Sequence, residues 1–262
     1  MKNITLSNND LSVVIDQGEL ISFKKGNEEL IHQKGAPGWR NSDTEMFPII
    51  GPTVSNNFVV ETPKGNCIQD QHGLLREFAY TVLESNKTSL SLQKEYKANT
   101  KIKNSKFPNK STEEFQFWPY DFTFIKRYVL EDDHLKIIFQ IQSEKDMPFM
   151  LGYHPAFKLS GNATEICKTN TKTATVKDVM DAGSTAFPFL NTDEITLVKE
   201  NGHNVTIKTK GFNNFMLWTE VTNMLCIEPI TEYPYTGKKK LEPNLFNKAS
   251  GNDFFEVTIF PE

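Results

Sequence analysis

Short runs in which apolar and polar residues alternate are the feature that most constrains the fold of this chain. The clearest run, residues 135–142, has Leu, Ile, Phe and Ile at its odd positions and polar residues at three of its four even positions. Similar runs occur at residues 11–15, 20–23, 78–82, 90–92, 205–207 and 255–259. Because side chains of a strand alternate between two faces, each run predicts a half-buried strand.

Gly, Asn, Asp and Pro separate these runs, and the sequence has no long apolar repeat at helical spacing. Many short strands with frequent turns predict an all-β fold, a large antiparallel sandwich or barrel. A length of 262 residues suits one large all-β domain or two small ones. Since we find neither an internal repeat nor a linker, we predict one domain over residues 1–262.

Charge and hydropathy exclude several classes of partner. The net charge of −4 gives no reason to expect nucleic acid or an anionic membrane as a partner. Polar residues interrupt positions 1–7, so we expect no signal peptide, and without a run of about 18 apolar residues we expect no transmembrane helix. Cys67, Cys167 and Cys226 are odd in number and far apart, which indicates reduced thiols and a cytoplasmic location.

Two segments are rich in lysine, residues 94–110 and residues 238–240. The first interpretation is a solvated, mobile loop, and we favour it for both segments. The second is a basic lip over a site that attracts an anionic substrate.

Of the five histidines, three lie in turns or at a strand end and are interpreted as surface residues: His32, His134 and His203. His154 instead lies within the apolar run 149–159 and directly before Pro155. Proline favours extended geometry for the residue before it and is confined to strand ends, edges and bulges. We therefore expect His154 where a strand leaves its sheet. A core histidine with a satisfied hydrogen bond explains this stretch equally well.

Like His154, two further polar residues, His72 and Glu228, directly precede a glycine or proline and are candidates for chemistry. His72 precedes Gly73, which permits positive φ or a close approach of ligand to backbone, and Arg76 follows with a rigid donor fork. A plain turn also explains His-Gly. Glu228 ends the apolar run 224–228 and precedes Pro229. Burial would raise the pKa of Glu228 towards values useful for a general base, whereas the alternative is a strand-end glutamate that faces water.

The three residues together are more informative than each alone. The sequence has no Cys–His or Ser–His–Asp signature and no phosphate-binding glycine loop, and its histidines are too isolated for metal-ligand spacing. We therefore predict no cofactor and no metal site. An acid–base pair of this kind suits proton transfer on an uncharged polar substrate.

Three segments resemble the signature motifs of the aldose 1-epimerase (galactose mutarotase) family, in its shorter, LacX-like branch: residues 71–76 (QHGLLR), 152–157 (GYHPAF) and 226–229 (CIEP). Residues 46–51 (MFPIIG) and 118–122 (WPYDF) agree, and the ordered match spans essentially the whole chain. The resemblance implies the large antiparallel β-sandwich of galactose mutarotases, the supersandwich. It also implies interconversion of the α and β anomers of a free aldose.

The resemblance further implies roles for individual residues. Glu228 would be the general base that takes the proton of the C1 hydroxyl, and His154 the general acid that donates to the ring oxygen. His72 would hydrogen-bond the sugar near that oxygen. Trp218 is our leading aromatic platform for the sugar, with a core tryptophan as the alternative, and Tyr153 is ambiguous between sugar contact and core packing.

One position departs from the family pattern. Many members have a sugar-binding arginine directly after the glycine that corresponds to Gly51, where this chain has Pro52. Arg40 or Arg76 are the candidates to replace it. This departure motivates a first alternative, a non-catalytic sugar-binding or sensing protein. The lysine-rich segment motivates a second, a hexose-phosphate mutarotase. In each case the partner is a monosaccharide, and we expect a monomer or weak homodimer.

Overall fold

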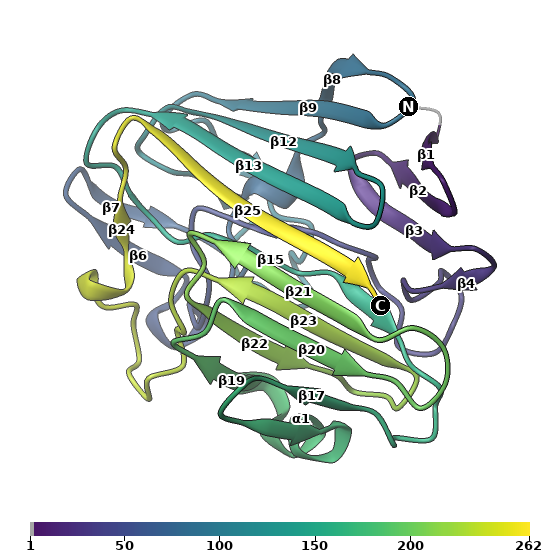
Figure 1. Cartoon of the computed structure of the whole chain (residues 1–262). Helices are drawn as coiled ribbons and strands as arrows, with labels where there is room; N and C mark the ends of the chain where they lie inside the picture. Colours follow the sequence, from purple (N-terminus) through teal and green to yellow (C-terminus); the bar gives the residue numbers. More distant parts are fainter. Residues whose placement is uncertain (1–2) are drawn as a thin grey trace.

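The computed structural model describes residues 3–262. Met1 and Lys2, part of the segment 1–7 in which we expect no signal peptide, lie outside the described residues. Its architecture is that of an antiparallel β-sandwich, as predicted, with two large sheets and several smaller ones. Figure 1 shows β9, β12, β13 and β25 side by side across the molecule. Among the described residues, no helix has the length and hydropathy needed to cross a membrane.

The larger sheet has nine strands. In spatial order they are β18 (Thr173–Thr175), β17 (Ile166–Lys168), β20 (Glu194–Val198), β21 (Val205–Lys210), β25 (Asn252–Pro261), β13 (Leu135–Ser143), β12 (Phe122–Leu130), β9 (Ser89–Tyr96) and β8 (Thr81–Ser85).

The smaller sheet has six strands and carries the site described below. These are β19 (Phe187–Leu190), β22 (Asn214–Trp218), β23 (Met224–Ile230), β15 (Gly152–Tyr153) and β5 (Glu45–Met46), with β16 (Ala156–Lys158) also paired to β23.

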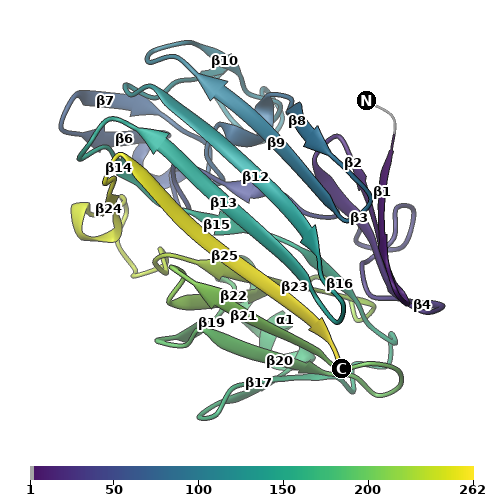
Figure 2. The ribbon, with the colours of Figure 1, turned by 45° about the horizontal axis from the view of Figure 1, so that its top comes forward.

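A four-stranded N-terminal sheet lies beside the C-terminal end of β12, as Figure 2 shows. It consists of β1 (Ile4–Asn8), β2 (Leu11–Asp16), β3 (Glu19–Lys25) and β4 (Glu28–Glu29). Three two-stranded sheets pair β6 (Val59–Thr62) with β7 (Gly65–Ile68), β10 (Ile102–Lys103) with β11 (Phe115–Gln116), and β14 (Pro148–Phe149) with β24 (Asn247–Lys248). The helical segments are α1 (Val176–Ala182) and four 3₁₀ turns, η1 (Val54–Asn56), η2 (Leu75–Glu77), η3 (Gly183–Thr185) and η4 (Pro243–Leu245).

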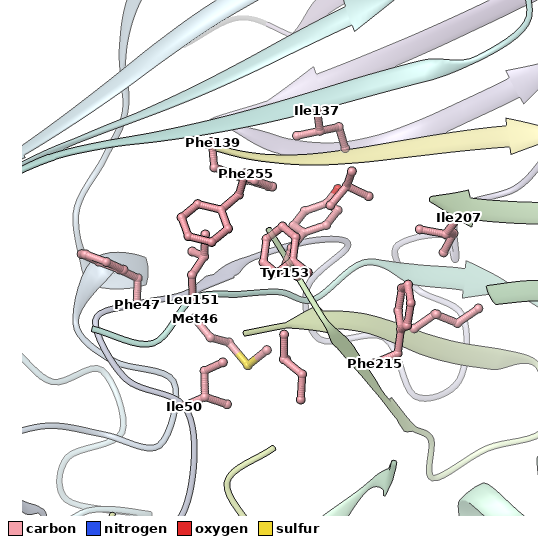
Figure 3. Packing of buried hydrophobic residues seen from close by; sticks show 14 of the residues in the cluster. Met46, Phe47, Ile50, Ile137, Phe139, Leu151, Tyr153, Ile207, Phe215 and Phe255 are labelled. Atoms are coloured by element: carbon pink, nitrogen blue, oxygen red, sulfur yellow. The ribbon is translucent and has the colours of Figure 1, made fainter. Parts of the chain in front are cut away.

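The alternating runs explain how the two large sheets pack. In β13 the odd-numbered residues from 135 to 141 are fully buried, as the period-two pattern predicts. Phe139 of β13 lies against Tyr153 of β15, with ring centroids 5.3 Å apart. Figure 3 shows side chains of the larger sheet and of the smaller sheet meeting in one layer. Burial of these apolar side chains between the sheets is the main stabilising contribution to such a fold.

Some expectations from sequence were wrong. The run 78–82 does not form an alternating strand, because β8 begins at Thr81 and all its residues are exposed. His32 is buried rather than at the surface, and its Nε2 lies 3.0 Å from the carbonyl oxygen of Pro37. Lys94 is also buried, in β9, where its Nζ donates to the carbonyl oxygen of Leu75 (2.9 Å). By contrast, residues 238–240 are exposed, as the first interpretation predicts.

A network of buried polar residues lies within the sandwich. Lys126 of β12 has no exposed side-chain surface, and its Nζ lies 3.0 Å from Asp43 Oδ2 and 2.6 Å from Glu45 Oε1. The hydroxyls of Tyr128 and Tyr153 donate to the same Asp43 oxygen, at 3.1 Å and 2.5 Å. A buried ammonium requires such partners, since isolated buried charge is costly. The network therefore anchors the segment 43–45 to the interior of the fold.

Candidate active site

His154 and Glu228 are brought together by strand register. β15 and β16 both pair antiparallel with β23 and continue one register on either side of His154. The paired positions are Gly152 with Ile230 and Ala156 with Cys226. Position 154 lies midway and therefore opposite position 228. The result is a separation of 3.2 Å between His154 Nε2 and Glu228 Oε1.

His154 lies where the sequence predicts, directly after β15 ends at Tyr153. Its backbone N–H donates to the carbonyl oxygen of Thr44 (2.8 Å), which fixes the chain at this exit. Its side chain is 20% exposed. Burial, and then the positive charge of Arg76, lower the pKa of His154 to about 4, so the imidazole is neutral at neutral pH.

Glu228 is buried, as the first of its two interpretations requires, but it lies within its strand and not at the end. The expectation that its strand ends at Glu228 was wrong, because β23 continues through Pro229 to Ile230 and pairs with β22 along this length. Glu228 is 1% exposed, and neither carboxylate oxygen has a hydrogen-bond partner in residues 3–262. Burial raises the pKa of Glu228 well above its ordinary value, although the charge of Arg76 opposes this shift.

His72 is held beside His154 by a glycine turn and an arginine. Gly73 has φ +70°, and a Cβ there would lie 2.1 Å from the carbonyl oxygen of Phe47, so only glycine fits. The rings of His72 and His154 are perpendicular, with centroids 5.7 Å apart.

Arg76 determines the tautomer of His72. Arg76 Nη1 lies 2.6 Å from His72 Nδ1, and Arg76 Nη2 donates to Thr44 Oγ1 (2.9 Å). Because a guanidinium only donates, Nδ1 of His72 accepts and Nε2 carries the proton. Burial and the charge of Arg76 keep the pKa of His72 well below its usual range. His72 is therefore a neutral residue whose free ring nitrogen is a hydrogen-bond donor.

These side chains line a cavity of 920 Å³. The structure brings six of the seven residues chosen from sequence to its wall: His72, His154, Glu228, Arg76, Arg40 and Trp218. The seventh, Tyr153, is fully buried in the core and bonded to Asp43, so it is not brought to the cavity. Its ring packs between the sheets, since Tyr153 alternates with its neighbours in β15 and points away from His154's side.

One wall of the cavity combines an aromatic ring with an exposed arginine. Trp218, at the end of β22, has its ring centroid 6.4 Å from that of His154. The guanidinium of Arg40 lies 5.5 Å from the Trp218 ring, and its Nη2 lies 2.6 Å from Glu220 Oε2. An aromatic face beside donor groups is an arrangement suited to a polar ligand with an apolar face.

Other residues of the cavity wall were not among the seven chosen from the sequence. Lys106 and Lys110 lie in the wall, and Lys106 Nζ is 2.6 Å from the buried Asp70, so two lysines of the segment 94–110 reach the site, as its second interpretation expects. α1 contributes Met180, and its first turn is closed by a capping box of Thr175 and Asp178. That box, three residues apart in the sequence, was a readable signal of a helix start.

Cys226 was also missed as a site residue, although its position two before Glu228 in a strand places both on one face. Potential ligand atoms of His154, Cys226 and Glu228 all lie within 4.8 Å of one another. His154 is distant in the sequence from the other two residues, so their spacing gave no sign that all three share a site.

Comparisons with known proteins identify the family of this chain. The family model described as aldose 1-epimerase matches residues 2–243. The protein LacX of Lactococcus lactis subsp. lactis, in a plasmid and a chromosomal form, is 28% identical over 148 residues. Each alignment covers 53% of this chain and 44% of the relative, so the match spans less than half the length of those curated proteins.

Solved structures share the fold at low sequence identity. A galactose mutarotase-like protein from Lactobacillus casei ATCC 334 has a TM-score of 0.79 at 17% identity, with 99% of each chain covered. A galactose mutarotase related enzyme from Lactobacillus acidophilus has a TM-score of 0.77 at 18% identity, covering 100% of this chain and 97% of the other. The family suggested by the motifs is thereby confirmed: this chain belongs to the aldose 1-epimerase family.

Proposed function

We propose that the protein interconverts the α and β anomers of an aldose by opening and reclosing the sugar ring. Family membership supports a reaction of this type. The observation that carries the proposal is the 3.2 Å separation between His154 Nε2 and Glu228 Oε1 in the wall of a polar cavity. The C1 hydroxyl and the ring oxygen are bonded to the same carbon, so two adjacent proton-transfer groups match them.

The proton balance of the reaction needs one proton shared by the pair. In the ring-opening step Glu228 takes the proton of the C1 hydroxyl, His154 donates its proton to the ring oxygen, and the C1–ring oxygen bond breaks. The pair then consists of a protonated carboxyl and a neutral imidazole. After rotation about C1–C2, both transfers reverse and closure yields the other anomer.

The pKa directions of the pair suit this cycle. A raised pKa for Glu228 and a lowered pKa for His154 favour the neutral pair, which is the form present beside the open-chain aldehyde. Carboxylate with imidazolium holds the same number of protons, so moving one proton between the two residues prepares the ring-opening form. The 3.2 Å separation between His154 Nε2 and Glu228 Oε1 is short enough for that transfer.

The surrounding residues serve as binding groups in this proposal. His72 Nε2–H donates to the ring oxygen or a neighbouring hydroxyl, and Trp218 receives the apolar face of the sugar. Arg76 and Arg40 are the two arginines in the cavity wall, and they supply donors that the family pattern would place at Pro52. The proton-transfer groups, His154 and Glu228, contribute more directly to the rate, since removing a positioned general acid or base typically costs about 10²–10⁴-fold.

Polarimetry of freshly dissolved sugars tests the proposal. A panel of free aldoses, including α-glucose and α-galactose, should reach anomeric equilibrium faster with protein than with buffer. Glu228→Gln should abolish the acceleration in a protein that remains folded by circular dichroism. If folded wild-type protein accelerates mutarotation of no aldose in the panel, the proposal is wrong.

Two alternatives are distinguished by measuring sugar binding beside anomer exchange. Saturable sugar binding without anomer exchange would indicate a sugar-binding protein, which the proline at position 52 motivates. A salt-sensitive preference for a hexose phosphate would indicate a phosphate-specific mutarotase, which Lys106 and Lys110 in the cavity wall motivate. We rank the phosphate-specific enzyme below the free-sugar enzyme because Asp70 already neutralises Lys106.

A further inference from the structure

A sulfur, an imidazole nitrogen and a carboxylate oxygen converge at one place in the cavity. Cys226 and Glu228 point to one side of β23, and His154 faces them from the exit of β15. One potential ligand atom from each residue lies within 4.8 Å of the other two. All three residues line the cavity, so a fourth position next to them is open to it.

The carboxylate of Glu228 can still accept a hydrogen bond or bind a cation. Glu228 is 1% exposed, yet neither of its oxygens has a hydrogen-bond partner among residues 3–262. A buried polar group without a partner costs free energy, and a cation or ligand that satisfies it recovers that cost. Cys226, also buried, offers a sulfur on the same side.

We propose that His154, Cys226 and Glu228 form a three-ligand site for a thiophilic divalent cation such as Zn²⁺, and that this cation blocks the sugar site. The inhibitory part rests on the proposed mutarotase function, whereas the binding part does not. Cysteine, histidine and carboxylate ligands are those that Zn²⁺ prefers, and a site with three protein ligands keeps one position for water.

The geometry needs only a small adjustment. Zn²⁺ bonds of about 2.0–2.3 Å place tetrahedral ligand atoms roughly 3.5 Å apart. The existing group, within 4.8 Å, reaches that spacing by side-chain rotation. On binding, the Cys226 thiol gives its proton to solvent and the thiolate bonds to the metal. His154 and Glu228 then bond to the metal with the atoms that must move protons, so bound metal and sugar turnover exclude each other.

Cobalt absorption tests the site without any activity assay. Chelator-treated wild-type protein should bind one Co²⁺ with a thiolate-to-cobalt charge-transfer band, and Zn²⁺ should displace it. Cys226→Ser and Cys226→Ala should lose that band and bind Zn²⁺ at least tenfold more weakly by calorimetry. Cys167→Ser is the matched control, since Cys167 is equally buried but lies in β17, and it should bind as wild type does.

Inhibition provides a second readout. Zn²⁺ should slow mutarotation by wild type and by Cys167→Ser, with recovery on adding chelator, and each Cys226 variant should be less sensitive relative to its own metal-free rate. Metal binding with the thiolate band in a protein without mutarotase activity would support the site and refute only the proposed function. Binding that lacks the band, or that is equal in wild type and the Cys226 variants, would overturn the site whatever the activity.

Discussion

His154 Nε2 lies 3.2 Å from Glu228 Oε1. The pKa of His154 is lowered and the pKa of Glu228 is raised, so the site disfavours the charged form of each side chain. Desolvation is the main cause for both, since Glu228 is buried in the cavity wall and the His154 side chain is only 20% exposed there. The proposed chemistry uses both side chains at once, so its rate depends on the protonation state of each. The pair performs the proposed chemistry only while it holds one proton.

The first prediction concerns the pH dependence of kcat/KM. As pH falls through about 4, His154 gains a proton while Glu228 is already protonated, so the pair can no longer accept the C1 hydroxyl proton. As pH rises past the raised pKa of Glu228, the pair loses its remaining proton. We expect a bell-shaped profile by polarimetry, with its acid limb near pH 4. An acid limb centred at the ordinary histidine pKa of about 6.5 would contradict this assignment.

The second prediction concerns Glu228→Gln. The rate should fall by about 10²–10⁴-fold because the general base is lost. Stability should rise at neutral pH, since the fold favours protonated Glu228 whereas the unfolded chain ionises it. The wild-type contribution of this carboxyl is present below its unfolded pKa and is lost as pH rises through the raised folded value. Each 1 kcal/mol gained would raise Tm by about 2–4 °C.

Thermal unfolding at neutral and acidic pH measures that effect. The difference between Glu228→Gln and wild type should disappear below the ordinary glutamate pKa, where both states are protonated. Glu194→Gln is the matched control, because Glu194 is a half-exposed residue of β20 paired with Lys208 at the surface. A Glu228→Gln protein that is less stable than wild type at neutral pH would refute the argument.

The third prediction separates the two cavity arginines. Arg76→Ala removes a hydrogen bond of a charged donor to His72, worth about 1.5–3 kcal/mol, and should lower kcat/KM by roughly 10–100-fold. Because Arg76 lowers the pKa of His154, its removal should also move the acid limb to higher pH. Arg40→Ala should raise KM and leave that limb in place, since Arg40 bonds to Glu220 at the surface.

Rate profiles of the two variants over pH are the measurement. Equal displacement of the acid limb in both proteins would show that Arg76 has no special relation to His154.

The fourth prediction concerns the buried network around Asp43. Lys126→Met leaves the carboxylates of Asp43 and Glu45 buried without their ammonium partner and should cost roughly 3–5 kcal/mol of unfolding free energy in urea. The control is Lys177→Met, which removes the exposed pair of Lys177 with Asp181 on α1 and should leave stability unchanged. A stable Lys126→Met protein would mean that the network is dispensable for folding.

Sequence periodicity predicted most of the strands, because burial of one face of a strand imposes an alternating pattern on its residues. It failed at residues 78–82, where β8 is the edge strand of the larger sheet and no packed face constrains its pattern. Lys94 shows the opposite case. Its position continues the inward series of Leu90 and Leu92, and charge alone led to the wrong interpretation as a solvated loop.

The site was only partly readable from the sequence. Proline signals located His154 correctly at a strand exit, but Pro229 did not end its strand, because β23 is held between neighbours on both sides. Arg76 contacts His72 only four residues away, but its contact with Thr44 joins positions 32 residues apart in the chain. Local pattern contains no information on such contacts, and only the folded register supplies it.

The shared register of β15 and β16 on β23 has a consequence for how chain length can vary. Side chains alternate, so inserting or deleting one residue between Gly152 and Ala156 would turn His154 to the other face of the sheet, away from Glu228. This stretch cannot tolerate a change in length. The largely exposed wall segment 105–110, which carries Lys106 and lies outside any strand, is free of that constraint, so new sugar specificities can be sought by lengthening or shortening it.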